Sequence, residues 1–119
     1  MKTNLLLYLC LLSLTYSDFV FGQTPEMTWA FGLGSSNNED IHSVIVDQEG
    51  NVIITGGFYQ TIDFDPGQNI WNLTSSGDMD IYIAKYDPNG NLIWAQSLGG
   101  PAEDFGRCVR IDHSNNIYL

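Results

Sequence analysis

Basic residues are scarce in this chain. Of its 119 residues only 4 are Lys or Arg, against 14 Asp and Glu, so the formal net charge is −10 and the isoelectric point is about 4.1. Nucleic-acid binding needs clustered Lys and Arg to meet the phosphates. The composition therefore excludes that class of function, and the length suits one modest domain rather than a large multidomain enzyme.

Apolar runs long enough to cross a bilayer are lacking as well. The stretch Leu5–Leu14 is too short to span one comfortably, and it follows the single positive charge of Lys2. A cleavage site follows at Val20-Phe21-Gly22, with small or moderate residues at the −3 and −1 positions. This order predicts a signal peptide over residues 1–22, with cleavage after Ser17 as the alternative.

Cysteine is nearly absent. Of the two, Cys10 lies inside the predicted signal peptide and would be removed with it. Cys108 then stands alone in the mature chain, which excludes an internal disulfide. Because Cys108 lies in a strand-like stretch, we expect it to be buried as a small apolar residue.

Helical periodicity is also missing, since no stretch of the mature chain repeats its apolar residues at helical spacing over three turns. Four runs rich in β-branched and aromatic residues predict strands instead, at 44–46, 52–55, 80–86 and 92–95. The first two runs are apolar on both faces, so we expect them to form an inner, doubly covered pair. The last two carry Lys85 and Gln96, and we expect them nearer solvent.

What the chain does contain is an internal repeat. Residues 29–54 and 94–119 align without a gap at an offset of 65, with seven identities in 26 positions. Trp29-Ala30 recurs as Trp94-Ala95 in this alignment. Identities spread over Trp, Gly and turn positions indicate a repeated structural unit.

A shorter motif, D-x-x-[GN]-N, occurs three times between strand-like runs. Its Asp accepts bonds from backbone N–H groups further along, and its Gly or Asn adopts the left-handed conformation that closes a hairpin loop. The residues expected to shape these turns are Asp47, Gly50, Asn51, Asp87, Pro88, Gly90, Asn91, Asp112, Asn115 and Asn116.

Each repeat is therefore two hairpins, or four antiparallel strands, in about 65 residues, and such units around an axis form a β-propeller. We predict an all-β fold of antiparallel four-stranded β-propeller blades, with one full repeat plus partial repeats after the signal peptide. The expected divisions are 1–22, the signal peptide; 23–38, the outer strand of a preceding partial blade and its connection; 39–100, one four-stranded repeat; and 101–119, the start of the next. The connection 59–79 is long enough for a small extra hairpin.

Taken together, these motifs resemble the SBBP-type β-propeller repeat of secreted bacterial proteins. The motifs are found at Trp29–Ser35, Val44–Val52, Ile54–Phe58, Asp63–Gly67 and Asp80–Trp94. The resemblance implies a large exported protein, often surface-associated, with several repeats and no single established activity. The chain ends within its second repeat, so we expect it to be a fragment of a larger protein.

Four acidic residues bracket the long connection: Asp63, Asp65, Asp78 and Asp80. Oxygen-rich loops bind Ca²⁺, but the spacing does not match the D-x-[DN]-x-[DN]-G loop. We therefore favour turn or solvated-surface roles and predict no cofactor, with Ca²⁺ binding as the alternative.

Catalytic patterns are absent, because neither His42 nor His113 has a nucleophile-like Ser or Cys nearby in the sequence. We predict that the chain is not an enzyme. The aromatic residues Trp71, Tyr59 and Tyr82 are candidates for stacking on sugars or peptides, whereas Trp29 and Trp94 recur with the repeat and are expected to pack.

The sequence thus predicts an exported, non-enzymatic β-propeller-repeat segment that acts as a structural or protein-interaction scaffold. Its expected location is extracellular or at the cell surface, without a membrane span after signal cleavage. Expected partners are other β-propeller repeats or surface proteins, with glycans as a further possibility. The alternatives are a carbohydrate- or peptide-binding module, and part of a propeller hydrolase whose active site is on other blades.

Overall fold

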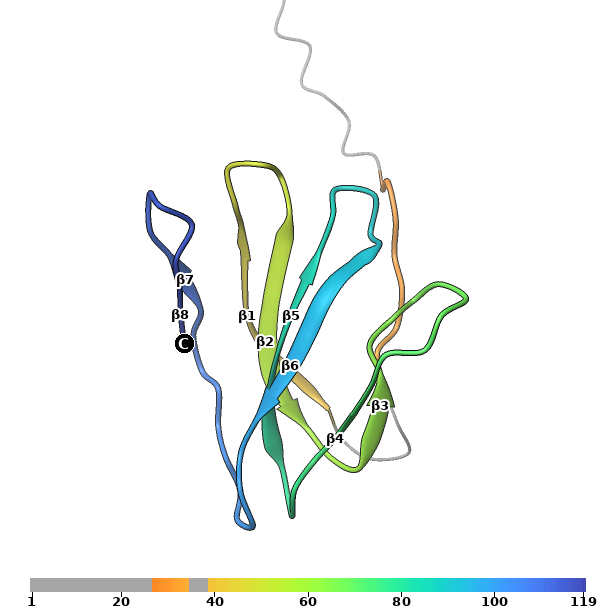
Figure 1. The fold of residues 1–119 in the computed structure, drawn as a ribbon, viewed down its shortest axis with the longest axis vertical. Helices are drawn as coiled ribbons and strands as arrows, with labels where there is room; N and C mark the ends of the chain where they lie inside the picture. Colours follow the sequence, from red (N-terminus) through yellow and green to blue (C-terminus); the bar gives the residue numbers. More distant parts are fainter. Residues whose placement is uncertain (1–26, 35–38) are drawn as a thin grey trace, which may run out of the picture.

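The computed structural model describes residues 27–34 and 39–119 (Figure 1). The predicted signal peptide lies outside the described residues. The described part is all-β and antiparallel, as predicted, and contains no helix. Its strands are β1 (Asp40–Val46), β2 (Val52–Phe58), β3 (Thr61–Asp63), β4 (Asn72–Thr74), β5 (Asp80–Tyr86), β6 (Leu92–Leu98), β7 (Arg110–Ile111) and β8 (Ile117–Tyr118).

A four-stranded antiparallel sheet in the order β1-β2-β5-β6 forms the centre of the molecule. This arrangement fits a propeller blade. The connection 59–79 returns the chain so that β5 lies beside β2, with Val52 opposite Tyr86 and Phe58 opposite Asp80. Within the connection, β3 and β4 form the small extra hairpin that its length predicted.

The prediction that the runs 44–46 and 52–55 form the inner pair of strands was wrong. The inner strands are β2 and β5, one from each hairpin, and most of their residues are buried. β1 is an edge strand and is largely exposed. Apolar patterning could not distinguish the two arrangements, because the order of strands depends on how the long connection returns the second hairpin to the first.

Both faces of this sheet carry a core. On one face the buried side chains of β2, β5 and β6, which include Phe58 and Tyr82, pack with Phe64 of the connection. Phe31 and Leu33 of the segment 27–34 lie against this cluster. On the other face Ile53, Ile83 and Val109 are buried together. Burying a large apolar side chain stabilises a fold by about 1.5–3 kcal/mol, so the sheet is stabilised from both sides.

The segments that cover the two faces are related to the sheet by the repeat. At the offset of 65, the hairpin β7–β8 corresponds to the turn ends of β1 and β2, and the segment 27–34 corresponds to β6. Ile111 and Ile117 of the β7–β8 hairpin pack against the second core. The central sheet therefore lies between parts of neighbouring units.

The pairing of β1 with β2 contains a β-bulge, which lies opposite a glycine. The register of β1 against β2 shifts at His42, which is an extra residue between the pairs Ile41–Gly56 and Ser43–Thr55. A Cβ on Gly56 would overlap the carbonyl group of Asp40. Only glycine allows the two strands to approach this closely at the bulge.

Candidate functional site

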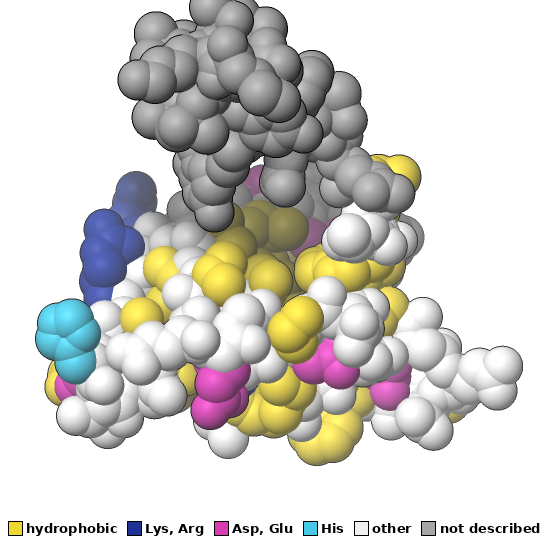
Figure 2. All heavy atoms as spheres, turned by 90° about the horizontal axis from the view of Figure 1, so that it is seen from above, with side chains coloured by type: hydrophobic (Ala, Val, Ile, Leu, Met, Phe, Trp, Pro, Cys, Tyr) yellow, Lys and Arg dark blue, Asp and Glu magenta, His cyan; other side chains and the backbone are white. Residues whose placement is uncertain are grey.

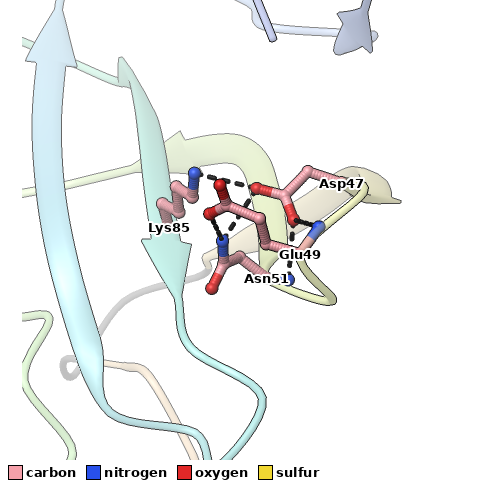
Figure 3. Close-up of polar contacts among 4 residues, drawn as sticks. All are labelled: Asp47, Glu49, Asn51 and Lys85. Carbon is pink, nitrogen blue, oxygen red and sulfur yellow. Dashed lines mark hydrogen bonds and ion pairs between the residues drawn. The ribbon is translucent and has the colours of Figure 1, made fainter. Parts of the chain in front are cut away.

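The three D-x-x-[GN]-N turns adopt the same hydrogen-bonded loop. In the first, Oδ1 of Asp47 accepts the backbone N–H of Glu49 and of Asn51, both at 2.9 Å. The side-chain amide of Asn51 donates to Oδ2 of Asp47 at 2.9 Å. Figure 3 shows these contacts converging on one carboxylate.

The second and third turns repeat this pattern with Asp87 and Asp112. The residue before the final Asn has positive φ in each turn, at 82° for Gly50, 84° for Gly90 and 62° for Asn115. All three positions therefore adopt the left-handed conformation that the motif predicted.

These hydrogen bonds hold the aspartates in their charged form. The Lys85 ammonium group lies 2.8 Å from Oδ2 of Asp47 and holds the pKa of that carboxyl well below its usual range. The side-chain amides of Asn91 and Asn116 lower the pKa of Asp87 and Asp112, the latter to about 2. Carboxylates engaged in this way hold turns together and are poorly suited to accept a proton from a substrate.

The Lys85–Asp47 contact ties the first turn to β5 (Figure 3). Lys85 is mostly covered, with a side-chain exposure of 18%, and the side chain of Asp47 is fully covered. No local pattern reveals this pair, since the two residues lie in different hairpins and meet only through the register of β2 against β5.

Three of the four candidate calcium ligands accept hydrogen bonds from backbone N–H groups near them in the chain. Oδ1 of Asp63 accepts the backbone N–H of Asp65 at 3.0 Å and that of Trp71 at 2.8 Å, which closes the loop between β3 and β4. Oδ1 of Asp65 accepts the N–H of Gly67. Asp78 is exposed and Asp80 is buried.

No cluster of three or more His, Cys, Asp or Glu side chains suited to a metal ion occurs among the described residues. Figure 2 shows the acidic side chains scattered over the end of the molecule that carries the hairpin turns.

Asp80 is only 1% exposed at the start of β5. Its Oδ2 accepts the backbone N–H of Ser76 at 2.9 Å, and its Oδ1 has no hydrogen-bond partner. A Cβ on Gly99 would collide with this carboxylate. Asp80 thus organises the loop before β5 and requires glycine in the loop after β6.

Among the aromatic candidates, Trp71 is 44% exposed and its indole N–H donates to the carbonyl of Ala95 on β6 at 3.1 Å. Tyr59 is half-buried, and burial together with the negative charge of Glu103 raises the pKa of its hydroxyl. The choice of Tyr82 as a candidate for stacking on a ligand was wrong, because its side chain is buried. It is 3% exposed and packs edge-on against Phe58 in the core.

The prediction for Cys108 was also wrong, because its side chain is exposed. The neighbouring Val109 takes the buried position, with 0% exposure. In extended backbone successive side chains point to opposite faces. Val109 therefore faces the core, and its neighbour Cys108 faces away from it.

Several tertiary contacts had no sequence signal. The hydroxyl of Tyr86 donates to the carbonyl of Phe64 at 3.0 Å, and the Trp29 indole N–H donates to the carbonyl of Pro88 at 3.1 Å. Nδ1 of His42 lies 2.8 Å from the carbonyl of Gly106. Each of these contacts joins segments far apart in the chain.

Among the described residues, no helix has the length and apolar character needed to cross a membrane.

Comparison with known proteins finds two proteins similar to this chain, one of which is a repeat protein. It is 32% identical, over 76% of its length, to an uncharacterised WD repeat-containing protein of Acanthamoeba polyphaga mimivirus. It is 22% identical, over 83% of its length, to the regulatory protein FlaEY of Caulobacter vibrioides. The chain spans only 8% and 10% of those two proteins.

No family model matches the chain, and no solved structure matches it. The similarity to a WD repeat-containing protein agrees with the blade-like sheet and indicates a β-propeller-like repeat. The finer SBBP-type resemblance has no matching family model.

Proposed function

We propose that this chain is part of an exported β-propeller-like repeat domain that acts as a non-enzymatic interaction scaffold. The observation that carries the proposal is the blade-like sheet, whose two faces are covered by segments related to its own strands at the offset of 65. A unit that buries both faces against its neighbours is suited to an array of structural repeats. The similarity to a WD repeat-containing protein and to a regulatory protein supports the proposed scaffold role.

The chemistry of the described residues supports a scaffold more than a catalyst. The aspartates of the turns are engaged by backbone and side-chain donors. The aromatic residues that recur with the repeat, Trp29 and Trp94, are partly buried. The surface that remains is acidic and includes the loops, and loops held by a rigid scaffold commonly carry binding residues.

Site-specific photo-crosslinking tests the scaffold role. A photoreactive phenylalanine analogue would replace Ile70 or Phe105, which are 74% and 50% exposed, and Ile53, which is 0% exposed, would serve as the buried control. We expect a discrete protein adduct from at least one exposed position and none from Ile53. Exported protein without any adduct at either exposed position would contradict the proposal.

Export has its own test. N-terminal sequencing of protein recovered outside the cell should begin at Gln23, or at Asp18 if cleavage follows Ser17. Recovery of the intact Met1 form from the cell interior alone would overturn export without touching the scaffold proposal.

A second candidate function is recognition of a carbohydrate or peptide through Trp71, since this residue remains 44% exposed although its indole N–H is engaged. Aromatic rings of this kind stack on sugars. A glycan array probed with the wild type and Trp71→Ala distinguishes the two. Binding that disappears on substitution favours recognition, whereas no binding by either protein favours the scaffold.

A further inference from the structure

The edge strand β1 carries exposed valines on an otherwise buried face of the sheet. Val44 lies opposite Ile54, and Val46 lies opposite Val52. Residues directly opposite each other in an antiparallel pair point to the same face. Both partners belong to or pack against the first core, the cluster that includes Phe58. The two valines therefore lie on the face of that core, yet they are 58% and 60% exposed.

The described segments that cover this face leave β1 open. The connection 59–79 packs against the first core through Phe64. The segment 27–34 does so through Phe31, whose ring centroid lies 4.9 Å from that of Tyr86. Figure 1 shows this segment beside the turn that joins β5 and β6. Neither segment shields the valines of β1 from solvent.

The internal repeat shows the same positions in a covered state. At the offset of 65, Val44 corresponds to Val109 and Val46 corresponds to Ile111. Val109 is 0% exposed and Ile111 is half-buried, and both contribute to the second core. Equivalent residues are thus exposed in one unit and covered in the next. What differs is that Val109 packs against the four-stranded sheet of the unit before it.

The surface that buries Val109 has a defined chemistry. It presents Ile53 from β2 and Ile83 from β5, which are 0% and 7% exposed. No side chain of this second core is ionisable, so the acidic charge of the chain lies outside the contact. In this chain the isoleucine face is already occupied by Val109. A face of the same kind for Val44 therefore belongs to a different unit.

We propose that Val44 and Val46 form a docking surface for a further repeat unit, whose sheet presents branched aliphatic side chains at the positions equivalent to Ile53 and Ile83. This inference rests on the proposed repeat domain and names the partner of one of its faces. Each unit then uses two different surfaces, the valines of β1 and the isoleucines of β2 and β5. Contacts between different surfaces join units head to tail.

Photo-crosslinking in the protein as its own cells make it tests this proposal. A small aliphatic amino acid that carries a diazirine would replace Val44 or Val46, and mass spectrometry would identify the crosslinked peptides. The same analogue at Ile111 is the positive control, and at Gln48, which is exposed in the first turn, it is the negative control.

From Ile111 we expect crosslinks to this chain's own peptides around Ile53 or Ile83. From Val44 or Val46 we expect crosslinks to a different peptide that aligns with β2 or β5 and carries Val, Ile or Leu at the equivalent position. Gln48 should give no such product. No crosslink from either valine, or crosslinks only to this chain's own residues or to a peptide without the repeat, would overturn the proposal.

A substitution at the neighbouring position separates docking from folding. With the analogue at position 46, Val44→Asp should lower the crosslink yield at least about tenfold, because docking would bury an unpaired charge. Val44→Ile should retain the yield. Hydrogen exchange should show unchanged protection in β2 and β5 of Val44→Asp, since Val44 is 58% exposed. An undiminished yield, or lost protection in these strands, would contradict the proposal.

The scaffold role stands or falls separately. Its test uses adducts from Ile70 and Phe105, neither of which lies on β1. Adducts from those positions without the expected products from Val44 and Val46 would overturn this inference alone. The converse result would confirm the docking surface and overturn the scaffold role.

Discussion

Asp47, Asp87 and Asp112 carry much of the local order in this protein. Each carboxylate accepts two backbone N–H groups and one Asn side-chain amide, and only their outer contacts differ. Asp47 adds Lys85, and Asp112 adds the hydroxyl of Tyr118. Part of the large negative charge is therefore engaged in turn formation.

The first prediction concerns pH. The pKa of each of these carboxyls in the folded chain lies below its usual value of 3.8, and that of Asp112 is about 2. A group whose pKa is lowered by folding stabilises the fold above its unfolded pKa and loses that contribution as the pH falls through its folded pKa. We expect the free energy of unfolding to fall as the pH drops from about 4 to about 2.

Urea unfolding followed by fluorescence across this pH range measures the effect. Asp112→Asn should make the dependence on pH shallower, because the variant removes one of the three titrating groups. A free energy of unfolding that rises as the pH falls through this window would contradict the assignment.

The second prediction concerns Tyr86, which is fully buried and donates to the Phe64 carbonyl. Tyr86→Phe leaves that carbonyl without its partner, and we expect a loss of about 1–2 kcal/mol in the free energy of unfolding. Tyr118→Phe is the control, since its hydroxyl bonds Asp112 at an exposed site. Equal effects of the two changes in chemical denaturation would be inconsistent with the buried contact.

At the scale of elements, the hairpins depend on positive φ at one position in each turn. Gly50 and Gly90 have nearly the same φ but different surroundings. A Cβ on Gly50 would lie 3.4 Å from Cγ of Pro88, whereas one on Gly90 would lie 2.9 Å from Cδ2 of Trp29. The second turn is therefore limited by packing as well as by backbone conformation.

The third prediction follows from this difference. Gly50→Ala should cost about 1–2 kcal/mol through its left-handed conformation. Gly90→Ala should cost a further amount of about 1–3 kcal/mol, because its Cβ meets the Trp29 ring. Thermal unfolding of both variants measures the difference, and Gly90→Ala no less stable than Gly50→Ala would show that Trp29 does not pack on this turn.

At the scale of the whole molecule, a central sheet packs between parts of its neighbours. The β7–β8 hairpin reaches the sheet through one small core in which Val109 and Ile53 are fully buried. Its own pairing is short, with Arg110 opposite Tyr118 and Ile111 opposite Ile117. A two-stranded unit of this size depends on packing for its stability.

The fourth prediction is that Val109→Ala releases this hairpin before the sheet. Losing two buried carbon atoms should cost about 2 kcal/mol at the contact. Hydrogen exchange should show lower protection in β7 and β8, with β2 and β5 unchanged. Cys108→Ala is the exposed neighbour and should have no effect. Uniform loss of protection across all strands would mean that hairpin and sheet unfold as one unit.

Much of this architecture could be predicted because its causes are local. The turns around Gly50, Gly90 and Asn115 follow from bonds within five residues, and the strands follow from β-branched runs that flank them. At the offset of 65, β7 and β8 correspond to the turn ends of β1 and β2, since similar sequence folds into similar hairpins. The prediction that Cys108 is buried was wrong, because a register difference of one residue in extended backbone turns a side chain from the core face to the solvent face.

The amino-acid sequence by itself determined the turns, the antiparallel hairpins and their repetition, since each depends on side chains and backbone groups close together in the chain. Only the tertiary structure decided which strands became central, that Lys85 meets Asp47, and that Trp71 lies on β6. The physical reason is the long connection between β2 and β5. It sets the register between two hairpins, and that register brings together residues that no local pattern relates.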